Sequence, residues 1–411
     1  MRTIERLNPL SYVIIAIVPI CVLVSFLATA FYRYGGNPNN YGMLLAWQTM
    51  IRDGVYLPSR FQGNLPSEII LGNLAHAFGP IGANSFSLLC AIAALILTYL
   101  IFRPFERDRL TLGLALAAIL ANPYFALSSI IAMDYVHPIP AFLGGVLLLQ
   151  RRLPVLAAIL FALAGAMRLS YAPMGLMALG YALVMTPDRP SRMIVAQSTA
   201  AFLVLLGYMY VPAFISAHLT LSFLGNAPPV WDGWFGWIAR WIYKTIYLYG
   251  LLGSLVVAFI VAGFFLTSMR GAPDEGRGAR RQFLYLCIGV IVFHLLLFFY
   301  LPVRIEYLIP AVIAFSGLMI YYKTSQWLMM ALIVAELSYA FVSVEVLRID
   351  HLNSAPCAPV VPTAVKFAPH FAPGVIWNEL TGTTNELACL PRMLLEPPET
   401  LGDRLPKPTR R

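Results

Sequence analysis

Long runs of apolar residues, separated by short polar segments, make up most of the chain as far as residue 346. A helix of about 20 apolar residues crosses the hydrocarbon core of a membrane, so the pattern predicts an all-α polytopic membrane protein with about eleven transmembrane helices. The predicted spans are residues 9–31, 84–102, 110–131, 137–150, 153–167, 171–186, 194–215, 246–269, 283–302, 306–322 and 327–346. The runs at 137–150, 153–167 and 171–186 are short for a full crossing.

The composition supports a membrane protein and excludes two other classes. Of the 411 residues, 59% are apolar and 11% are charged, and the mean hydropathy is +0.75, whereas a soluble domain has about 45–50% apolar and about 25% charged residues. The 13% aromatic content excludes intrinsic disorder, because disordered chains are poor in aromatic residues. The net charge of +9 requires no nucleic acid, since the cytoplasmic loops of membrane proteins are basic.

The basic residues predict the orientation of the chain. Arg2 and Arg6 precede a first apolar run that is longer than the roughly 7–15-residue core of a signal peptide, so we interpret it as an uncleaved span. With a cytoplasmic N-terminus, every short inner loop carries basic residues, as the positive-inside bias requires. These residues are Arg103, Arg107, Arg109, Arg151, Arg152, Arg189, Arg192, Arg270, Arg277, Arg280, Arg281 and Lys323.

An odd number of spans divides the chain into a transmembrane domain, residues 1–346, and an outer tail, residues 347–411. Two larger loops, residues 32–83 and 216–245, also lie on the outer side in this topology. The tail is polar and rich in proline, which predicts a small appendage with little regular structure.

The cysteines fit the same topology. Cys21, Cys90 and Cys287 lie within predicted spans, where a thiol is a small buried apolar group. Cys357 and Cys389 lie in the tail, on the side of the membrane where disulfides persist. We expect these two residues to form a disulfide that closes a loop of about 30 residues.

The first outer loop contains more structure than a connection needs. Residues 41–53 have an apolar helical face that would lie flat in the headgroup region, and a second short helix is expected from Ser67 to about Phe78. The segment between them carries Arg60 and ends at Glu68. Either Arg60 belongs to a site, or the loop is an extra connection with a solvated arginine.

Two polar residues lie between the third and fourth apolar runs. Asp134 is flanked by apolar and aromatic residues and is followed three positions later by His137. Loss of solvent would raise the pKa of such a carboxyl and suit it to general-base catalysis. Alternatively, Asp134 caps the N-terminus of the following helix.

Two arginines at outer helix ends, Arg168 and Arg304, run against the charge bias. A planar guanidinium binds phosphate oxygens well, so one interpretation is a phosphate site. The other is a local ion pair, of Arg304 with Glu306 or of Arg168 with an acid elsewhere.

Few ionisable residues lie in the middle of a span, which argues against a transport pathway. His294 and Glu336 are the clearest examples, and we interpret both as partners in helix–helix hydrogen bonds. Four tryptophans at helical spacing, Trp231, Trp234, Trp237 and Trp241, indicate an interfacial aromatic belt or, alternatively, an aromatic wall for a sugar or prenyl chain.

Three motifs, taken together, resemble the GT-C superfamily of membrane glycosyltransferases. The stretch SRFQGNLPSE at residues 59–68 is similar to an Arg-x-x-Gly-x-Pro-x-x-Glu-like element of bacterial members, with one extra residue before the proline. Met133-Asp134-Tyr135 resembles the acidic motif of their second outer loop, and residues 304–310 (RIEYLIP) resemble an Arg/Glu-Tyr-Leu-Leu-Pro element. The resemblance covers most of residues 1–346 and implies a GT-C-like bundle in the bacterial inner membrane, with its site facing the periplasm.

The chain departs from this family at one position. The family usually has an Asp or Glu just after the first span, taken to be the catalytic base, whereas the matching stretch here contains Asn39 and Asn40. An amide does not accept a proton at neutral pH. The resemblance therefore makes Asp134 the first candidate for the base and Asp53 the second.

The remaining roles follow from the same resemblance. Arg60, Arg168 and Arg304 would bind the donor phosphate, and Glu68 and Glu306 would orient these arginines. Substrate contacts are assigned to His137, Asn39, Asn40 and Tyr307. No Asp-x-Asp pair occurs in the outer segments, so the sequence gives no support for a divalent metal, and no other cofactor is expected.

These assignments predict an inverting glycosyltransferase. A base would activate an acceptor hydroxyl of a glycan, lipid or protein, which attacks the sugar of a polyprenyl-phosphate donor while arginines stabilise the departing phosphate. One alternative is a polymerase or ligase that acts on lipid-linked glycans. Another is a flippase or transporter of lipid-linked sugars, which would have an inverted repeat or paired broken helices; neither is evident in the sequence.

Overall fold

The computed structural model describes residues 9–29, 34, 38–60, 63–186, 188–217, 233–269, 277–301, 304–341, 343–345 and 366–368. These residues are almost all helical, which confirms the predicted all-α class. The helices are α1 (Pro9–Thr29), α2 (Pro38–Asp53), α3 (Leu65–Phe102), α4 (Arg109–Ala121), α5 (Pro123–Ile130), α6 (Pro138–Gln150), α7 (Pro154–Met167), α8 (Tyr171–Met185), α9 (Arg189–Ala217), α10 (Gly233–Tyr247), α11 (Gly250–Met269), α12 (Arg277–Tyr300), the 3₁₀ helix η2 (Ile305–Leu308), α13 (Ile309–Tyr321) and α14 (Gln326–Phe341).

The number of apolar segments in the described ranges agrees with the predicted eleven. Five helices, α1, α3, α9, α11 and α12, are long and apolar enough to cross a membrane, and α4 with α5 makes a sixth segment that is bent by 71°. The other five, which are shorter, are α6, α7, α8, η2 with α13, and α14. The chain is therefore a multi-pass membrane protein, and the predicted shortness of residues 137–186 is confirmed.

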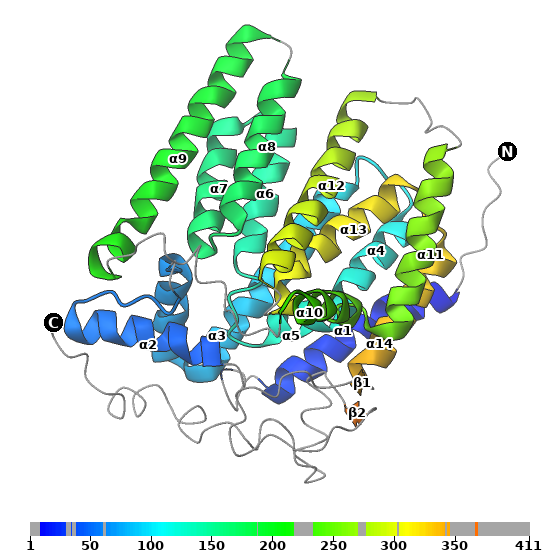
Figure 1. Cartoon of the computed structure of the whole chain (residues 1–411), viewed down its shortest axis with the longest axis horizontal. Coiled ribbons are helices and arrows are strands. Elements are labelled where there is room, and N and C mark those ends of the chain that lie inside the picture. The colour runs from blue at the N-terminus through cyan, green and yellow to red at the C-terminus, as the bar shows by residue number, and fades with distance from the viewer. Residues whose placement is uncertain are drawn as a thin grey trace.

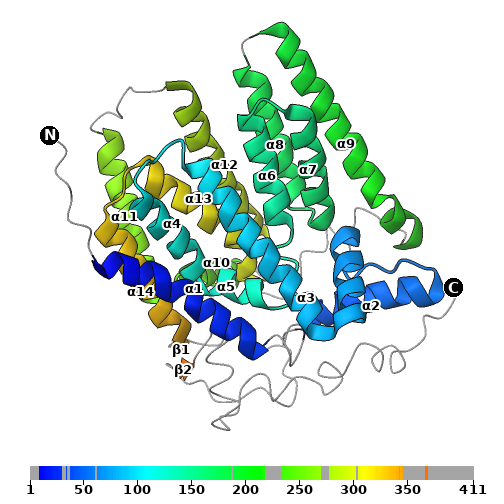
Figure 2. The ribbon, with the colours of Figure 1, turned by 180° about the vertical axis from the view of Figure 1, so that it is seen from behind.

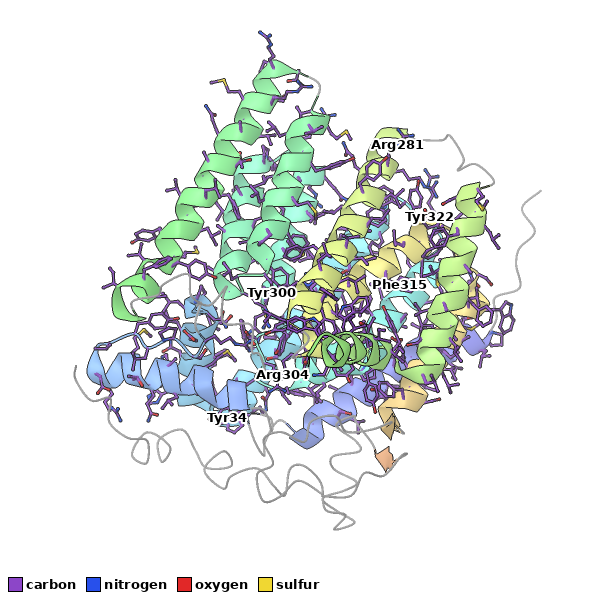
Figure 3. All side chains as sticks on the ribbon, in the orientation of Figure 1. Tyr34, Arg281, Tyr300, Arg304, Phe315 and Tyr322 are labelled. Carbon is purple, nitrogen blue, oxygen red and sulfur yellow. The ribbon has the colours of Figure 1, made fainter. Side chains whose placement is uncertain are left out.

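Two groups of helices stand side by side. Helices α6, α7, α8 and α9 pack together in one group, and α1, α4, α11, α12, α13 and α14 form the other (Figure 1). Arg281 and Arg304 lie at opposite ends of α12 (Figure 3). We call the end of the bundle with Arg304 and α2 the α2 end, and the end with Arg281 the basic end.

Proline and polar caps set where many of these helices begin. Pro123, Pro138, Pro154 and Pro310 lie in the first turn of α5, α6, α7 and α13, where the missing N–H would have no helical partner. The Asp108 carboxylate accepts hydrogen bonds from the N–H groups of residues 110 and 111 and so caps α4.

The first loop folds into two helices around Arg60, as predicted. Helix α2 packs its apolar residues Met43 and Leu44 against Leu71 of α3. Helix α3 is broken at Gly79, whose φ of 64° is in the left-handed region that glycine tolerates, and Pro80 follows. Figure 2 shows the two parts of α3 running in different directions. The second surface helix begins at Leu65, two residues before the predicted start, and continues directly into the span.

The end of the last span differs from the prediction. Helix α14 stops at Phe341, and Ser343–Glu345 (β1), which were assigned to the span, form an antiparallel pair with Lys366–Ala368 (β2) of the tail. Backbone hydrogen bonding to the tail thus replaces the last helical turn. The remainder of the tail, including Cys357 and Cys389, lies outside the described residues, and their disulfide stays a prediction.

Candidate functional site

A tight turn between α2 and α3 positions Arg60. The amide N–H of Gly63 donates to the carbonyl oxygen of Arg60 at 2.9 Å, with Gly63 at a φ of +77°. The buried Glu68 carboxylate accepts hydrogen bonds from the Tyr56 hydroxyl and from both the backbone N–H and the hydroxyl of Ser59. Glu68 therefore anchors the segment that carries Arg60 and forms no ion pair with an arginine in the described residues, so its orienting role stays a prediction that would act through Ser59.

Asp134 joins this segment to two other parts of the chain. It lies between α5 and α6, is fully buried, and forms ion pairs with Arg60 at 2.7 Å and with Arg168 at 2.8 Å. The Asn64 amide adds a hydrogen bond of 3.0 Å to the same carboxylate. Residues from positions 60, 64, 134 and 168 thus converge on one carboxyl group, and the ion-pair interpretation of Arg168 is confirmed.

The interpretation of Asp134 as a helix cap is wrong. The residue at the N-cap position of α6 is His137, whose side chain makes no capping hydrogen bond among the described residues. Both oxygens of Asp134 instead receive donors from other elements, Oδ1 from Arg60 and Oδ2 from Arg168 and Asn64. These long-range contacts stabilise the connection between α5 and α6.

Two tyrosines enclose Arg168. The central guanidinium carbon lies 4.0 Å from the ring centre of Tyr135 and 4.9 Å from that of Tyr307. Arg60 also lies over the Tyr135 ring, at 5.5 Å. Such cation–π contacts favour a guanidinium that has lost solvent. Tyr307 comes from η2, so the helix start that carries Arg304 and Glu306 also reaches the cluster.

The charges of the arginines determine the state of Asp134. Burial alone would raise the pKa of its carboxyl, but the positive charges of Arg60 and Arg168 outweigh burial and hold the pKa below its ordinary value. Asp134 is therefore ionised at neutral pH. Two guanidinium groups share this one carboxylate, which leaves one positive charge to be balanced by other groups.

His137 lies on the other side of the same connection. Its Nε2 is 2.9 Å from the Ser87 hydroxyl of α3, and both side chains are buried. Burial lowers the pKa of His137 to about 4 despite the nearby charge of Asp134. The imidazole is consequently neutral at physiological pH.

The other predicted site residues have different surroundings. Arg304 is half-buried at the α2 end, and it forms no ion pair with Glu306, although both residues are described. Glu306 is close enough to Tyr135 for its charge to add to burial in raising the pKa of that phenol. Asp53 lies at the end of α2, where it pairs with the neighbouring Arg52 at 3.0 Å and is partly exposed.

Asn39 and Asn40 lie in the first turn of α2, but their side chains are outside the described residues. The contacts of the two amides, and their predicted contact with substrate, therefore stay predictions.

Two of the four tryptophans have described side chains, and both pack on α12. The indole N–H of Trp237 donates to the carbonyl oxygen of Phe299 at 2.6 Å, and the rings of Trp241 and Phe299 meet edge to face. Helix α10 thus lies across the α2 end of α12 (Figure 1). This position is consistent with an interfacial belt.

An apolar crevice lies between the two groups of helices. Open solvent included, the space inside it is about 490 Å³. Its walls include Ile139, Phe142 and Val146 of α6, Tyr171 of α8, Val290 of α12 and Ala314 of α13. Tyr171 lies three residues after Arg168 and Ile139 two residues after His137, so the crevice begins beside the charged cluster and extends along α6 for about 10 Å.

Several buried polar atoms of the cluster have no hydrogen-bond partner within the described part of the chain. They are Arg60 Nε, Asn64 Oδ1, Tyr135 Oη, His137 Nδ1 and Tyr171 Oη. Buried polar atoms are nearly always hydrogen-bonded in native proteins, so water molecules or a polar ligand would have to supply the partners of these donors and acceptors. Asn64, Tyr135 and Tyr171 were not selected from the sequence, although each lies within four residues of an arginine or acid that was.

His294 and Glu336 both make the expected interhelical contacts. His294 Nε2 lies 3.1 Å from the Met174 sulfur of α8, and Glu336 of α14 accepts a hydrogen bond of 3.2 Å from Asn122, which lies between α4 and α5. The His294 ring also meets the ring of Tyr171 edge to face, with ring centres 6.3 Å apart, whereas Glu336 makes no described contact with the Asp134 cluster.

Comparison with known proteins gives one relevant similarity. No protein-family model matches the sequence, and no curated protein matches it significantly. Among solved structures, the chain is similar to ArnT from Cupriavidus metallidurans bound to undecaprenyl phosphate, with 14% sequence identity and a TM-score of 0.53. The match covers 74% of this chain but only 59% of ArnT.

This similarity establishes the fold. The helical bundle described above has the same type of fold as the ArnT structure, and it matches the all-α, GT-C-like fold that the sequence motifs predicted. At 14% identity the likeness does not transfer an activity.

Proposed function

We propose that this chain is a glycosyltransferase that takes a sugar from a polyprenyl-phosphate donor at the periplasmic face of the bacterial inner membrane. In this proposal the N-terminus and the basic end are cytoplasmic, as the charge bias indicates, and the α2 end is periplasmic. The observation that carries the proposal is that two arginines, Arg60 and Arg168, share one carboxylate in a cluster that also contains Tyr171, a residue that lines the apolar crevice. Cationic donors close to an apolar crevice match a phosphate attached to a hydrocarbon chain.

The two arginines have different roles in this proposal. The Arg60 side chain is 11% exposed and its Nε has no partner among the described residues, so Arg60 is placed to bind a donor phosphate. Arg168 is more enclosed, since two tyrosine rings cover it and Asp134 binds its Nη1. We assign Arg168 to the positive potential of the site and to the positioning of Asp134. Arg304, at the start of η2, is the third phosphate candidate.

The identity of the base stays a prediction. Asp134 was the first candidate, but three donors occupy its two oxygens and its pKa lies below the ordinary value. A carboxylate in this state is a weak proton acceptor. We therefore favour Asp134 as a positioning residue that holds both arginines. Asp53, the second candidate, lies at the partly exposed end of α2.

The proposed reaction balances without an oxidant or a reductant. The acceptor hydroxyl forms a new bond to the anomeric carbon, the bond from that carbon to the phosphate oxygen breaks, and the hydroxyl proton passes to a base. The departing polyprenyl phosphate gains negative charge, which nearby guanidinium groups stabilise. The neutral donors and acceptors of Tyr135 and Tyr171 are suited to the hydroxyl groups of a sugar.

The first test is binding of undecaprenyl phosphate to the purified full chain, measured by native mass spectrometry. We expect binding to the wild type and a loss of at least tenfold in affinity for Arg60→Ala, because a charge-assisted hydrogen bond to phosphate contributes about 1.5–3 kcal/mol. Arg52→Ala removes a partly exposed arginine eight residues away and is the matched control.

Two further measurements make the test decisive. Undecaprenol, which lacks the phosphate, should bind equally to the wild type and to Arg60→Ala. Membranes that contain the chain should transfer sugar from synthetic polyprenyl-phosphate sugars, and Arg60→Ala should reduce this transfer. Equal affinity of the wild type for undecaprenyl phosphate and undecaprenol would contradict the phosphate site, and absence of transfer from every donor would contradict the enzyme.

A further inference from the structure

A second buried polar centre lies away from the arginine cluster, at the break between α4 and α5. Glu336 of α14 is fully buried about 15 Å along its helix. Its Oε1 accepts a hydrogen bond from the Asn122 amide, whereas its Oε2 has no partner in the part of the chain that the structure describes. No arginine, lysine or histidine in the described ranges forms an ion pair with Glu336. An ionised carboxylate inside a membrane bundle requires compensation.

The break between α4 and α5, at Asn122, changes the hydrogen bonding of the last turn of α4. Pro123 has no N–H, and the amide N–H groups of Tyr124 and Phe125 donate to the side-chain oxygen of Asn122 at 3.2 and 3.3 Å. In a continuous helix these two N–H groups would donate to carbonyl groups in the last turn of α4. Those carbonyl groups therefore lack these two hydrogen bonds. The C-terminal end of a helix is also the negative end of its dipole.

A third element completes the surroundings. The Asn122 amide donates to the carbonyl oxygen of Leu248, just before α11, at 2.9 Å. A Cβ added at Gly253 of α11 would lie 4.0 Å from Cγ of Glu336, so the backbone of α11 passes close to the carboxylate. Glu336 Oε1 and the carbonyl oxygen of Leu248 thus meet at the same amide group of Asn122, the residue that directly follows α4.

From this arrangement we infer a binding site for one monovalent cation, Na⁺, between Glu336 and the end of α4. The ligands would be Glu336 Oε2, the carbonyl oxygen of Leu248 and carbonyl oxygens of the last turn of α4. Interrupted membrane helices use free carbonyl groups and helix C-terminal ends in this way to coordinate Na⁺. The cation would link three helical elements of the group that contains α12 and α13.

The donor set favours a monovalent ion. One carboxylate balances one positive charge, whereas Ca²⁺ sites generally draw on several carboxylates. The described residues contain no group of three or more His, Cys, Asp or Glu side chains that could hold a metal ion, so a transition-metal site is not indicated. The inference does not depend on the proposed glycosyl transfer.

The test compares thermal unfolding of the purified full chain in NaCl and in choline chloride at equal ionic strength. We expect a saturable rise in Tm with Na⁺ concentration, by about 2–4 °C once the site is filled. Glu336→Gln keeps the size of the side chain and its hydrogen bond from Asn122, and it should remove the rise. Glu106→Gln, the same change in the polar connection before α4, is the matched control and should retain it.

Direct binding of ²²Na⁺ to the wild type provides a measurement that needs no variant to fold. Saturable binding of one ion per chain, lost in Glu336→Gln, is the expected result. Identical unfolding of the wild type in both salts, without ²²Na⁺ binding, would overturn the inference and identify Glu336 as a neutral, protonated carboxyl. A Na⁺ effect that persists in Glu336→Gln would also overturn it, because the ion would then bind elsewhere.

Discussion

The guanidinium carbon of Arg168 lies 4.0 Å from the ring centre of Tyr135, while one nitrogen of the same group donates to Asp134, the residue just before that tyrosine. One arginine therefore holds two consecutive residues of the connection between α5 and α6. Tyr307 covers Arg168 as well, at 4.9 Å. Because η2 carries Tyr307, this stacking couples the two groups of helices at the α2 end.

Removal of the charge at Asp134 should be far more damaging than the same change at Asp53. Asp134→Asn leaves two buried guanidinium groups without a counter-charge, which should cost about 3–5 kcal/mol of folding free energy. Asp53→Asn weakens an exposed pair with Arg52 and should cost less than about 1 kcal/mol. Unfolding of both variants under the same conditions measures the difference, and similar losses would exclude a stabilising role for Asp134.

Transfer activity of the same two variants tests the base assignments. If Asp134 only positions the arginines, Asp134→Asn should mainly weaken donor binding and raise KM. A loss confined to kcat, with donor affinity unchanged, would instead support Asp134 as the base. Loss of kcat in Asp53→Asn would assign the base to Asp53.

Much of the fold was predictable because the membrane restricts the chain to a few structures. Backbone groups in lipid must form hydrogen bonds within the segment, so each apolar run becomes a helix and the number of runs gives the number of segments. Asn122 and Pro123 divide one run into α4 and α5, which hydropathy alone does not detect. The pairing of residues 343–345 with 366–368 was also missed, since it depends on a strand distant in the sequence.

The candidate site was only partly predictable for a related reason. Arg60, Asp134 and Arg168 were recognisable because charge at an outer helix end is unusual, and they do converge. Which acid faces which arginine depends on tertiary packing, so the sequence did not reveal that Asp134 pairs with both arginines while Glu68 holds Tyr56 and Ser59. Ser87 carried no signal, because a serine within an apolar run is common and its partner His137 lies 50 residues away.

Two glycines of the first loop provide a matched test of the turn that positions Arg60. Gly54 and Gly63 both have positive φ, 65° and 77°, but only Gly63 is closely packed, because a Cβ added there would lie 3.1 Å from both the Tyr56 hydroxyl and Ala213 Cβ. Alanine at either position should cost about 1 kcal/mol for the backbone. Gly63→Ala should also displace Arg60 and weaken binding of undecaprenyl phosphate, whereas Gly54→Ala should not. Equal affinities would show that the turn does not control the arginine.

The apolar crevice can be filled without changing any charge. Ala314 of α13 lines the crevice, so Ala314→Phe should occupy part of its space and lower the affinity for undecaprenyl phosphate by about tenfold. A short-chain isoprenyl phosphate should bind the variant and the wild type equally. Ala201→Phe on the exposed face of α9 is the control and should change neither affinity. Unchanged binding of the long-chain lipid to Ala314→Phe would place its hydrocarbon chain outside the crevice.

The neutral state of His137 should make stability depend on pH. Burial lowers its pKa to about 4 in the folded protein, against an ordinary value of about 6.5 in the unfolded chain. Between these values the unfolded chain binds more protons, so stability should fall as the pH falls from 7 to 5, by about 2 kcal/mol from this residue. Asp134 does not contribute in this range, because its lowered pKa affects stability only below about pH 4.

His137→Asn retains a polar partner for Ser87 and does not titrate, so thermal unfolding of this variant should depend less on pH than that of the wild type. If the stability of both proteins falls by the same amount between pH 7 and pH 5, folding does not lower the pKa of His137.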